Sequence, residues 1–190
     1  DFFTDWHGRI QLKQAGKVAL GGVLGALSLT FMLLTFFSVG TYALPAIAGA
    51  VLIPYVIEIS PRSAWMVYAS VAILSLFISP DLEAKVLFLS FFGYYPIIKA
   101  QLERIKKRPL EWVFKLALFN VAIVLSYYLM LNVFGLSIES FTLFGFNIVY
   151  IMLFVGNLIF VLYDLALTNL VLMYMRVLHK RVARVFHLNK

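Results

Sequence analysis

Six apolar runs, most of them long enough to cross the hydrocarbon core of a bilayer, constrain this chain more than any other feature. They are expected at about residues 17–37, 42–59, 64–78, 82–98, 109–134 and 144–174. With 63% hydrophobic and 13% charged residues, the chain is far more apolar than a soluble domain, where the shares are roughly one half and one quarter. We therefore expect an all-α polytopic membrane protein, a bundle of six transmembrane helices that forms a single domain over residues 1–190.

The charged segment Lys99–Arg108, KAQLERIKKR, lies between the fourth and fifth runs and orients the bundle. Its excess of Lys and Arg assigns it to the cytoplasm by the positive-inside rule. Alternation then places both termini in the cytoplasm, with residues 1–14 as an interfacial segment and residues 176–190 as a basic cytoplasmic tail. Asp81, Glu83 and Glu139 fall outside. The net charge of +7 thus reflects orientation in a cell membrane, and we expect no nucleic-acid partner.

Prolines and a glycine predict breaks in two of the runs. Pro45 and Pro54 predict kinks in the second run, and Gly93 with Pro96 predicts a joint in the fourth. The last run exceeds the length needed to span. It is either one tilted helix that projects into the cytoplasm, or a span that ends near Asp164 and is followed by an interfacial helix.

The sequence contains no pattern typical of an active site. Cysteine is absent, the three histidines lie near the termini without metal-ligand spacing, and neither a GxSxG motif nor a P-loop is present. We expect no enzymatic activity, no metal and no cofactor.

A polar stripe runs along the last apolar run and includes the ionisable residue deepest in any run, Asp164. Such a residue is costly in a membrane and is a functional candidate, although a helix-end role with a bond to Thr168 or Asn169 is an equal alternative. Two readings are also open for the intramembrane asparagines, a polar cavity or hydrogen bonds between helices. The polar positions are Asn120, Asn147, Tyr150, Asn157, Asp164 and Thr168.

Small residues recur at helical spacing in the first run. Ala15, Ala19, Gly22 and Ala26 fall on one helix face, which Gly21 and Gly25 widen. Helices in lipid associate through close backbone approach, so this face suits another helix. That helix belongs either to a partner protein or to the same bundle.

Six short spans, two cytoplasmic ends and a first helix that reads KVALGGVLGALSLTF resemble the substrate-binding S components of energy-coupling factor (ECF) transporters. The resemblance implies that Gly22 and Ala26 take the place of a small-residue motif that packs against a transmembrane coupling subunit, which two cytoplasmic ATPases drive. It also implies a small, vitamin-like or hydrophobic ligand bound toward the outer face. The positions implied for that ligand site are Thr41, Tyr42, Tyr127, Asn147 and Tyr150.

Two other functions fit the same sequence. One is a non-transporting scaffold subunit of a cell-envelope complex, similar in size and span number to MreD-type proteins, although the glycine-rich run with an embedded Asp expected there is missing. The other is a small carrier that acts alone and in which Asp164 titrates.

Overall fold

The computed structural model describes the chain except residues 1–13, 38–39, 106, 134–141, 144–145 and 178–190, and it describes only the backbone of residues 142–143 and 146–152. Most of the expected interfacial segment 1–14 and of the expected tail 176–190 therefore lies outside the described residues. Gln14 begins the first helix, and Arg176 lies in the last turn of the final one.

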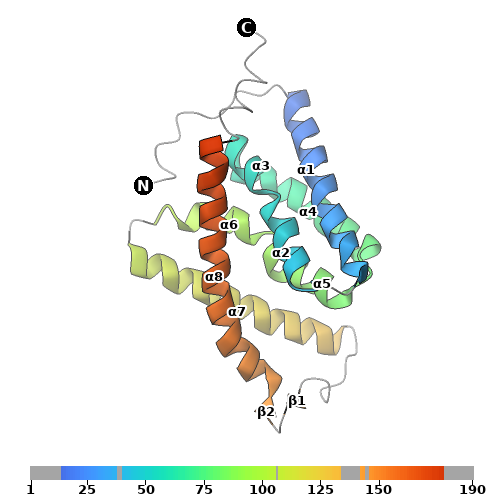
Figure 1. Ribbon diagram of the computed structural model, residues 1–190, viewed down its shortest axis with the longest axis vertical. Coiled ribbons are helices and arrows are strands. Elements are labelled where there is room, and N and C mark those ends of the chain that lie inside the picture. Colours follow the sequence, from blue (N-terminus) through green and yellow to red (C-terminus); the bar gives the residue numbers. More distant parts are fainter. Residues whose placement is uncertain (1–13, 38–39, 106, 134–141, 144–145, 178–190) are drawn as a thin grey trace.

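The described part of the chain is helical apart from one pair of two-residue strands (Figure 1). The elements are α1 (Gln14–Leu34), η1 (Thr35–Phe37), α2 (Ala43–Ala50), α3 (Ile53–Glu58), α4 (Pro61–Ile78), α5 (Leu82–Leu87), η2 (Phe88–Phe92), α6 (Tyr95–Leu102), α7 (Arg108–Asn132), β1 (Thr142–Leu143), β2 (Phe146–Asn147) and α8 (Ile148–Val177). β1 and β2 pair antiparallel, with Thr142 opposite Asn147.

Four stretches of the described residues are long and apolar enough to cross a membrane, which identifies the chain as a helical membrane protein. They are Gln14–Phe37, Pro61–Ile78, Arg108–Asn132 and Leu153–Val177. The other two apolar runs are each divided into shorter helices.

The second apolar run divides where proline predicts a break. α2 ends at Ala50, and α3 begins at Ile53 with Pro54 in its first turn, where the missing N–H of proline costs no helical hydrogen bond. The kink expected at Pro45 does not occur, because this residue lies in the first turn of α2 and the helix continues past it.

The fourth run contains the expected joint. α5 passes into the π-helix η2, and α6 restarts at Tyr95 with Pro96 in its first turn. The π-helix lies against α2 at a glycine. A Cβ on Gly49 would lie 2.0 Å from the carbonyl oxygen of Phe92, so only glycine permits this close approach.

The last apolar run forms one continuous helix, which decides between the two alternatives for this segment. α8 begins at Ile148, later than the expected 144, because β1 and β2 precede it. Its 30 residues correspond to roughly 45 Å, more than the hydrocarbon thickness. Near its end the Tyr174 hydroxyl donates a hydrogen bond of 2.8 Å to the buried carboxylate of Glu58 at the end of α3.

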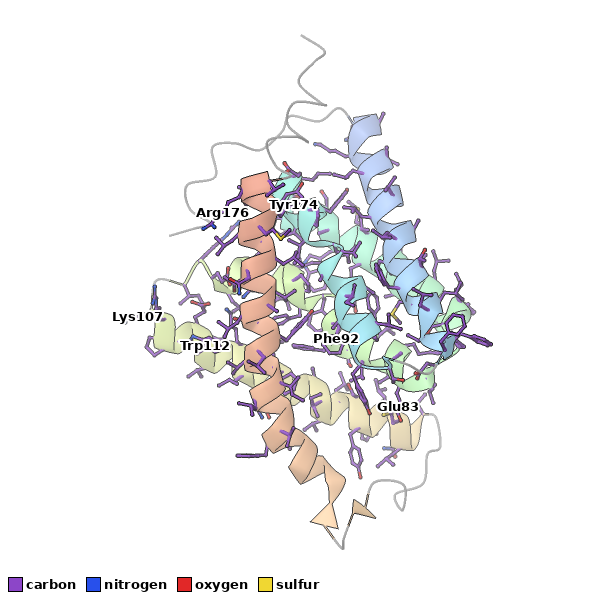
Figure 2. The ribbon with its side chains drawn as sticks, in the orientation of Figure 1. Glu83, Phe92, Lys107, Trp112, Tyr174 and Arg176 are labelled. Carbon is purple, nitrogen blue, oxygen red and sulfur yellow. The ribbon has the colours of Figure 1, made fainter. Side chains whose placement is uncertain are left out.

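The helices pack as a bundle with charged ends on opposite sides. α1 lies along α4 and α2, while α7 crosses α8 and contacts η2 and α5 (Figure 1). Lys107 and Arg176 lie toward one side of the bundle and Glu83 toward the other (Figure 2). Between these ends, aromatic rings from η2, α6, α7 and α8 form the main core, with Phe119 and Phe160 stacked at 4.8 Å between ring centroids.

Replacing Gly49 by alanine should destabilise the bundle, because the new methyl group would collide with the backbone of η2. Overpacking of this kind costs about 1–3 kcal/mol. Thermal unfolding in detergent micelles should show a lower midpoint for Gly49→Ala than for the control Gly22→Ala, whose Cβ would meet no atom within 4 Å. Equal midpoints would contradict the close approach of α2 and η2.

Candidate functional site

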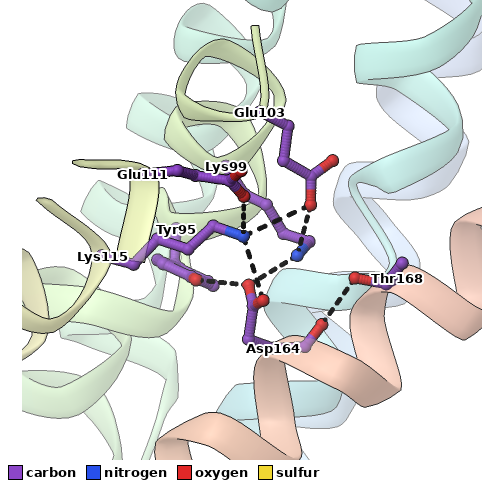
Figure 3. A network of polar contacts seen from close by, with 7 residues as sticks. All are labelled: Tyr95, Lys99, Glu103, Glu111, Lys115, Asp164 and Thr168. Atoms are coloured by element: carbon purple, nitrogen blue, oxygen red, sulfur yellow. Dashed lines mark hydrogen bonds and ion pairs between the residues drawn. The ribbon is translucent and has the colours of Figure 1, made fainter. Parts of the chain in front are cut away.

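Asp164 lies in the middle of α8, and helices α6 and α7 surround its carboxylate with donors (Figure 3). The side chain is almost completely buried. Oδ1 accepts hydrogen bonds from the Tyr95 hydroxyl at 2.6 Å and from Lys99 Nζ at 2.5 Å, and Oδ2 accepts one from Lys115 Nζ at 3.0 Å. Three segments distant in the sequence therefore meet at one carboxylate.

Two further carboxylates complete what we call the charge cluster, defined as Tyr95, Lys99, Glu103, Glu111, Lys115 and Asp164. Lys99 pairs with Glu103 at 2.6 Å, and Lys115 pairs with Glu111 at 2.7 Å and more distantly with Glu103 at 3.4 Å. Both lysines are 2% exposed, whereas the side chains of Glu103 and Glu111 are 17% and 15% exposed. Asp164 is therefore closed off from solvent, whereas the cluster is accessible to solvent at Glu103 and Glu111.

Two ammonium groups face three carboxylates, so the cluster carries one net negative charge when every group is ionised. Buried charges persist only when geometry and hydrogen bonds compensate for lost hydration. Here each lysine contacts at least two carboxylates, and the Tyr95 hydroxyl occupies a further lone pair of Asp164. The arrangement ties three helices together at one point.

Aromatic rings separate the charge cluster from the rest of the bundle core. Tyr95 stacks on Phe91 at 4.7 Å between centroids and meets Phe160 edge-on at 5.3 Å. Trp112 lies next to Lys115, whose Nζ is 5.3 Å from the ring centroid. These rings exclude water from one side of the cluster and thereby strengthen its ion pairs.

Asn120 of α7 and Asn157 of α8 form a reciprocal amide pair. Each side-chain nitrogen donates to the oxygen of the other residue, at 2.9 Å and 3.0 Å. Of the two readings of the intramembrane asparagines, hydrogen bonding between helices applies to this pair. The side chain of Asn147 lies outside the described residues.

The residues expected to bind a ligand are only partly brought together. The Thr41 hydroxyl donates to Asp81 at 2.7 Å, and the Tyr42 hydroxyl donates to Glu83 at 3.1 Å, so these four residues meet at one end of the bundle. Tyr127 is partly buried on α7. The side chains of Tyr150 and Asn147 lie outside the described residues, and the expected ligand site is therefore described only in part.

The small residues of α1 divide between two faces. Gly21 and Gly25 face Val67 and Val71 of α4, which explains the close packing of these helices. Ala15, Ala19, Gly22 and Ala26 are all exposed. Packing within the described bundle therefore uses the two additional glycines and leaves the other four small residues open.

Comparison with known proteins identifies no relative. The chain matches no family model, no curated protein and no solved structure.

Sequence reasoning singled out Asp164 but missed its partners. The sequence places Lys99 in the cytoplasmic segment Lys99–Arg108, whereas the structure buries it in α6. Lys115 forms an i,i+4 ion pair with Glu111 and also reaches Asp164. The alternative of a helix-end aspartate is wrong, because α8 continues for 13 residues beyond it and the Thr168 hydroxyl binds its main-chain oxygen. The sequence contains one indication of these partners. Both lysines lie next to strongly apolar stretches, where an opposite charge must compensate them.

Neutralising Asp164 should destabilise the protein strongly. Asp164→Asn keeps the shape but removes the charge that Lys99 and Lys115 share, and breaking a buried ion pair costs about 3–5 kcal/mol. Glu111→Gln, at a more exposed carboxylate, should cost about 1 kcal/mol or less. Thermal unfolding in detergent measures both variants, and an equal effect of the two would contradict the central role of Asp164.

Breaking the amide pair should have a smaller effect. Asn157→Leu leaves the Asn120 amide without its partner in α8 and should cost about 0.6 kcal/mol and at most about 1.7 kcal/mol, the average and the maximum measured for hydrogen bonds between membrane helices. The double variant Asn120→Leu/Asn157→Leu should be less destabilised than the two single effects added together. Strict additivity in thermal unfolding would show that the two amides act independently.

Proposed function

We propose that the protein is the substrate-binding membrane subunit of an ECF-type uptake transporter, with six membrane-crossing segments and both termini in the cytoplasm. In this arrangement the divided segments 43–58 and 82–102 cross the membrane together with the four long helices. The side of the bundle with Lys107 and Arg176 then faces the cytoplasm, and Glu83 faces the exterior, as the positive-inside rule requires (Figure 2).

The exposed small-residue face of α1 carries the proposal. Ala15, Ala19, Gly22 and Ala26 are exposed although α1 packs closely against α4 through its other glycines. A smooth face of this kind lets a partner helix approach closely in lipid. It therefore supports a subunit that works in a complex, with a transmembrane coupling subunit and cytoplasmic ATPases as the proposed partners.

The proposed ligand site lies at the exterior end, where Thr41 and Tyr42 meet Asp81 and Glu83. Hydroxyl and carboxylate groups at the mouth of an apolar bundle suit a small ligand with polar substituents. The charge cluster lies near the opposite end, and its ion pairs favour a structural role for Asp164 over the titration that a carrier acting alone would need.

Affinity purification in mild detergent, followed by mass spectrometry of bound proteins and small molecules, tests the function. Recovery of ATPases, a membrane subunit and a small molecule is the expected result. Recovery of cell-wall synthesis proteins would favour the scaffold alternative instead. A protein that purifies alone and without a ligand would contradict the transporter.

Leucine on the α1 face should weaken partner binding without unfolding the protein. Gly22→Leu and Ala26→Leu place bulk at exposed positions and should reduce the recovery of the coupling subunit at least tenfold, because the helices can no longer approach closely. Ala117→Leu, at an exposed alanine of α7, is the matched control. Unchanged recovery with both α1 variants, at unchanged thermal stability, would exclude this face as the interface.

A further inference from the structure

An open groove of about 560 Å³ runs between α1 and α4 on the outside of the bundle. Its α1 side is lined by the small residues Gly21, Gly22, Gly25 and Ala26, of which Gly22 and Ala26 also belong to the proposed partner face. Its walls are apolar, with Val18 and Leu29 on α1 and Val67 and Leu74 on α4. Both helices belong to membrane-spanning stretches, so the groove opens toward hydrocarbon. This volume falls in the range of sites that hold small molecules.

Among the described residues that line the groove, Lys17 alone is charged. Gly21 lies against Val67 and Gly25 against Val71, so α1 and α4 run in the same direction along it. Lys17 lines the groove near the start of α1, and the exposed Arg62 lies in the first turn of α4, at the same end. None of the carboxylates in the described part of the chain pairs with Lys17.

The length of the groove matches one leaflet of a bilayer. Lys17 and Leu29 are 12 residues apart in α1, or roughly 18 Å along the helix, and one leaflet contributes about 15 Å of hydrocarbon. An occupant with an anionic head and a single apolar chain of that length matches the charge of Lys17 and the apolar walls of the groove. A partner helix that crosses the whole membrane would extend well beyond the groove.

We propose that this groove binds one anionic phospholipid, with its phosphate at Lys17 and one acyl chain along the small residues of α1 toward Leu29 and Leu74. That this lipid comes from the cytoplasmic leaflet rests on the orientation proposed above. The groove and its charge do not depend on that orientation. Because Gly22 and Ala26 line both the groove and the proposed partner face, a partner helix that packs on them has to displace the lipid. The bound lipid would also make the packing of α1 on α4 dependent on membrane composition.

Native mass spectrometry of the full chain in mild detergent tests the proposal, with phosphatidylglycerol and phosphatidylcholine of identical acyl chains supplied at equal concentration. One phosphatidylglycerol should be retained with about fivefold preference, the effect of roughly one favourable charge interaction at a membrane surface. Lys17→Gln should bring the two lipids close to parity, whereas Lys107→Gln should keep the preference. Equal retention by the unmodified protein, or an unchanged preference in Lys17→Gln, would overturn the proposal.

The acyl-chain part of the site is tested from α4, the helix that forms the other side of the groove from Gly22 and Ala26. Ser70→Phe fills the groove from an exposed position and should reduce retention of both lipids at least fivefold. Ala69→Phe, on the same helix turn and exposed but outside the groove, is the matched control. If Ser70→Phe lowers the unfolding midpoint, Met66→Trp serves as a second variant that fills the groove. Lipid retention in Ser70→Phe and Met66→Trp equal to that in Ala69→Phe would overturn the assignment.

A protein occupant gives a different result. Cross-linking from Ser70→Cys to a co-purified membrane protein, in preparations that retain no phospholipid, would overturn the lipid assignment and leave the proposed transport function in place. Gly22→Leu and Ala26→Leu also fill the groove, so both variants should lower lipid retention as Ser70→Phe does, and unchanged retention in both would overturn the acyl-chain part of the assignment.

Discussion

The carboxylate of Asp164 holds together the half of the bundle that contains α6, α7 and α8. It accepts hydrogen bonds from the Tyr95 phenol and the Lys99 ammonium of α6 and from the Lys115 ammonium of α7. Because charge is costly in an apolar interior, these groups are stable only in mutual contact. The register of α6 and α7 on α8 is therefore fixed by a polar interaction, which is selective in a way that the surrounding aliphatic packing is not.

The other half of the bundle depends on shape. α2 reaches the π-helix η2 at Gly49, and α1 reaches α4 at Gly21 and Gly25. In lipid, burial of apolar side chains gives little net drive, because the tails are as apolar as the side chains, so close backbone contact has to supply the attraction. Hydrogen bonds between helices, such as the one that the Ser28 hydroxyl donates to the carbonyl of Ala48 at 2.9 Å, add to it.

The contacts that hold the bundle together leave one face of α1 exposed. The glycines used for packing lie on one side of α1, and the exposed small residues lie on another, so a partner can approach without competing with the internal fold. The groove between α1 and α4 lies beside these buried glycines and is also lined by the exposed Gly22 and Ala26. Because Gly22 and Ala26 line this groove, a docking subunit and a bound lipid compete for the same surface.

The amino-acid sequence by itself determined the helical membrane class, the joints at Pro54 and Gly93 and the exceptional position of Asp164. Hydropathy, backbone-breaking residues and intramembrane charge act locally, so composition and spacing reveal them. Only the tertiary structure decided that Lys99 and Lys115 compensate Asp164, that Asn120 pairs with Asn157 and that Gly49 lies against Phe92. These contacts join residues 37 to 65 positions apart, and their register depends on how helices pack, which no local pattern encodes.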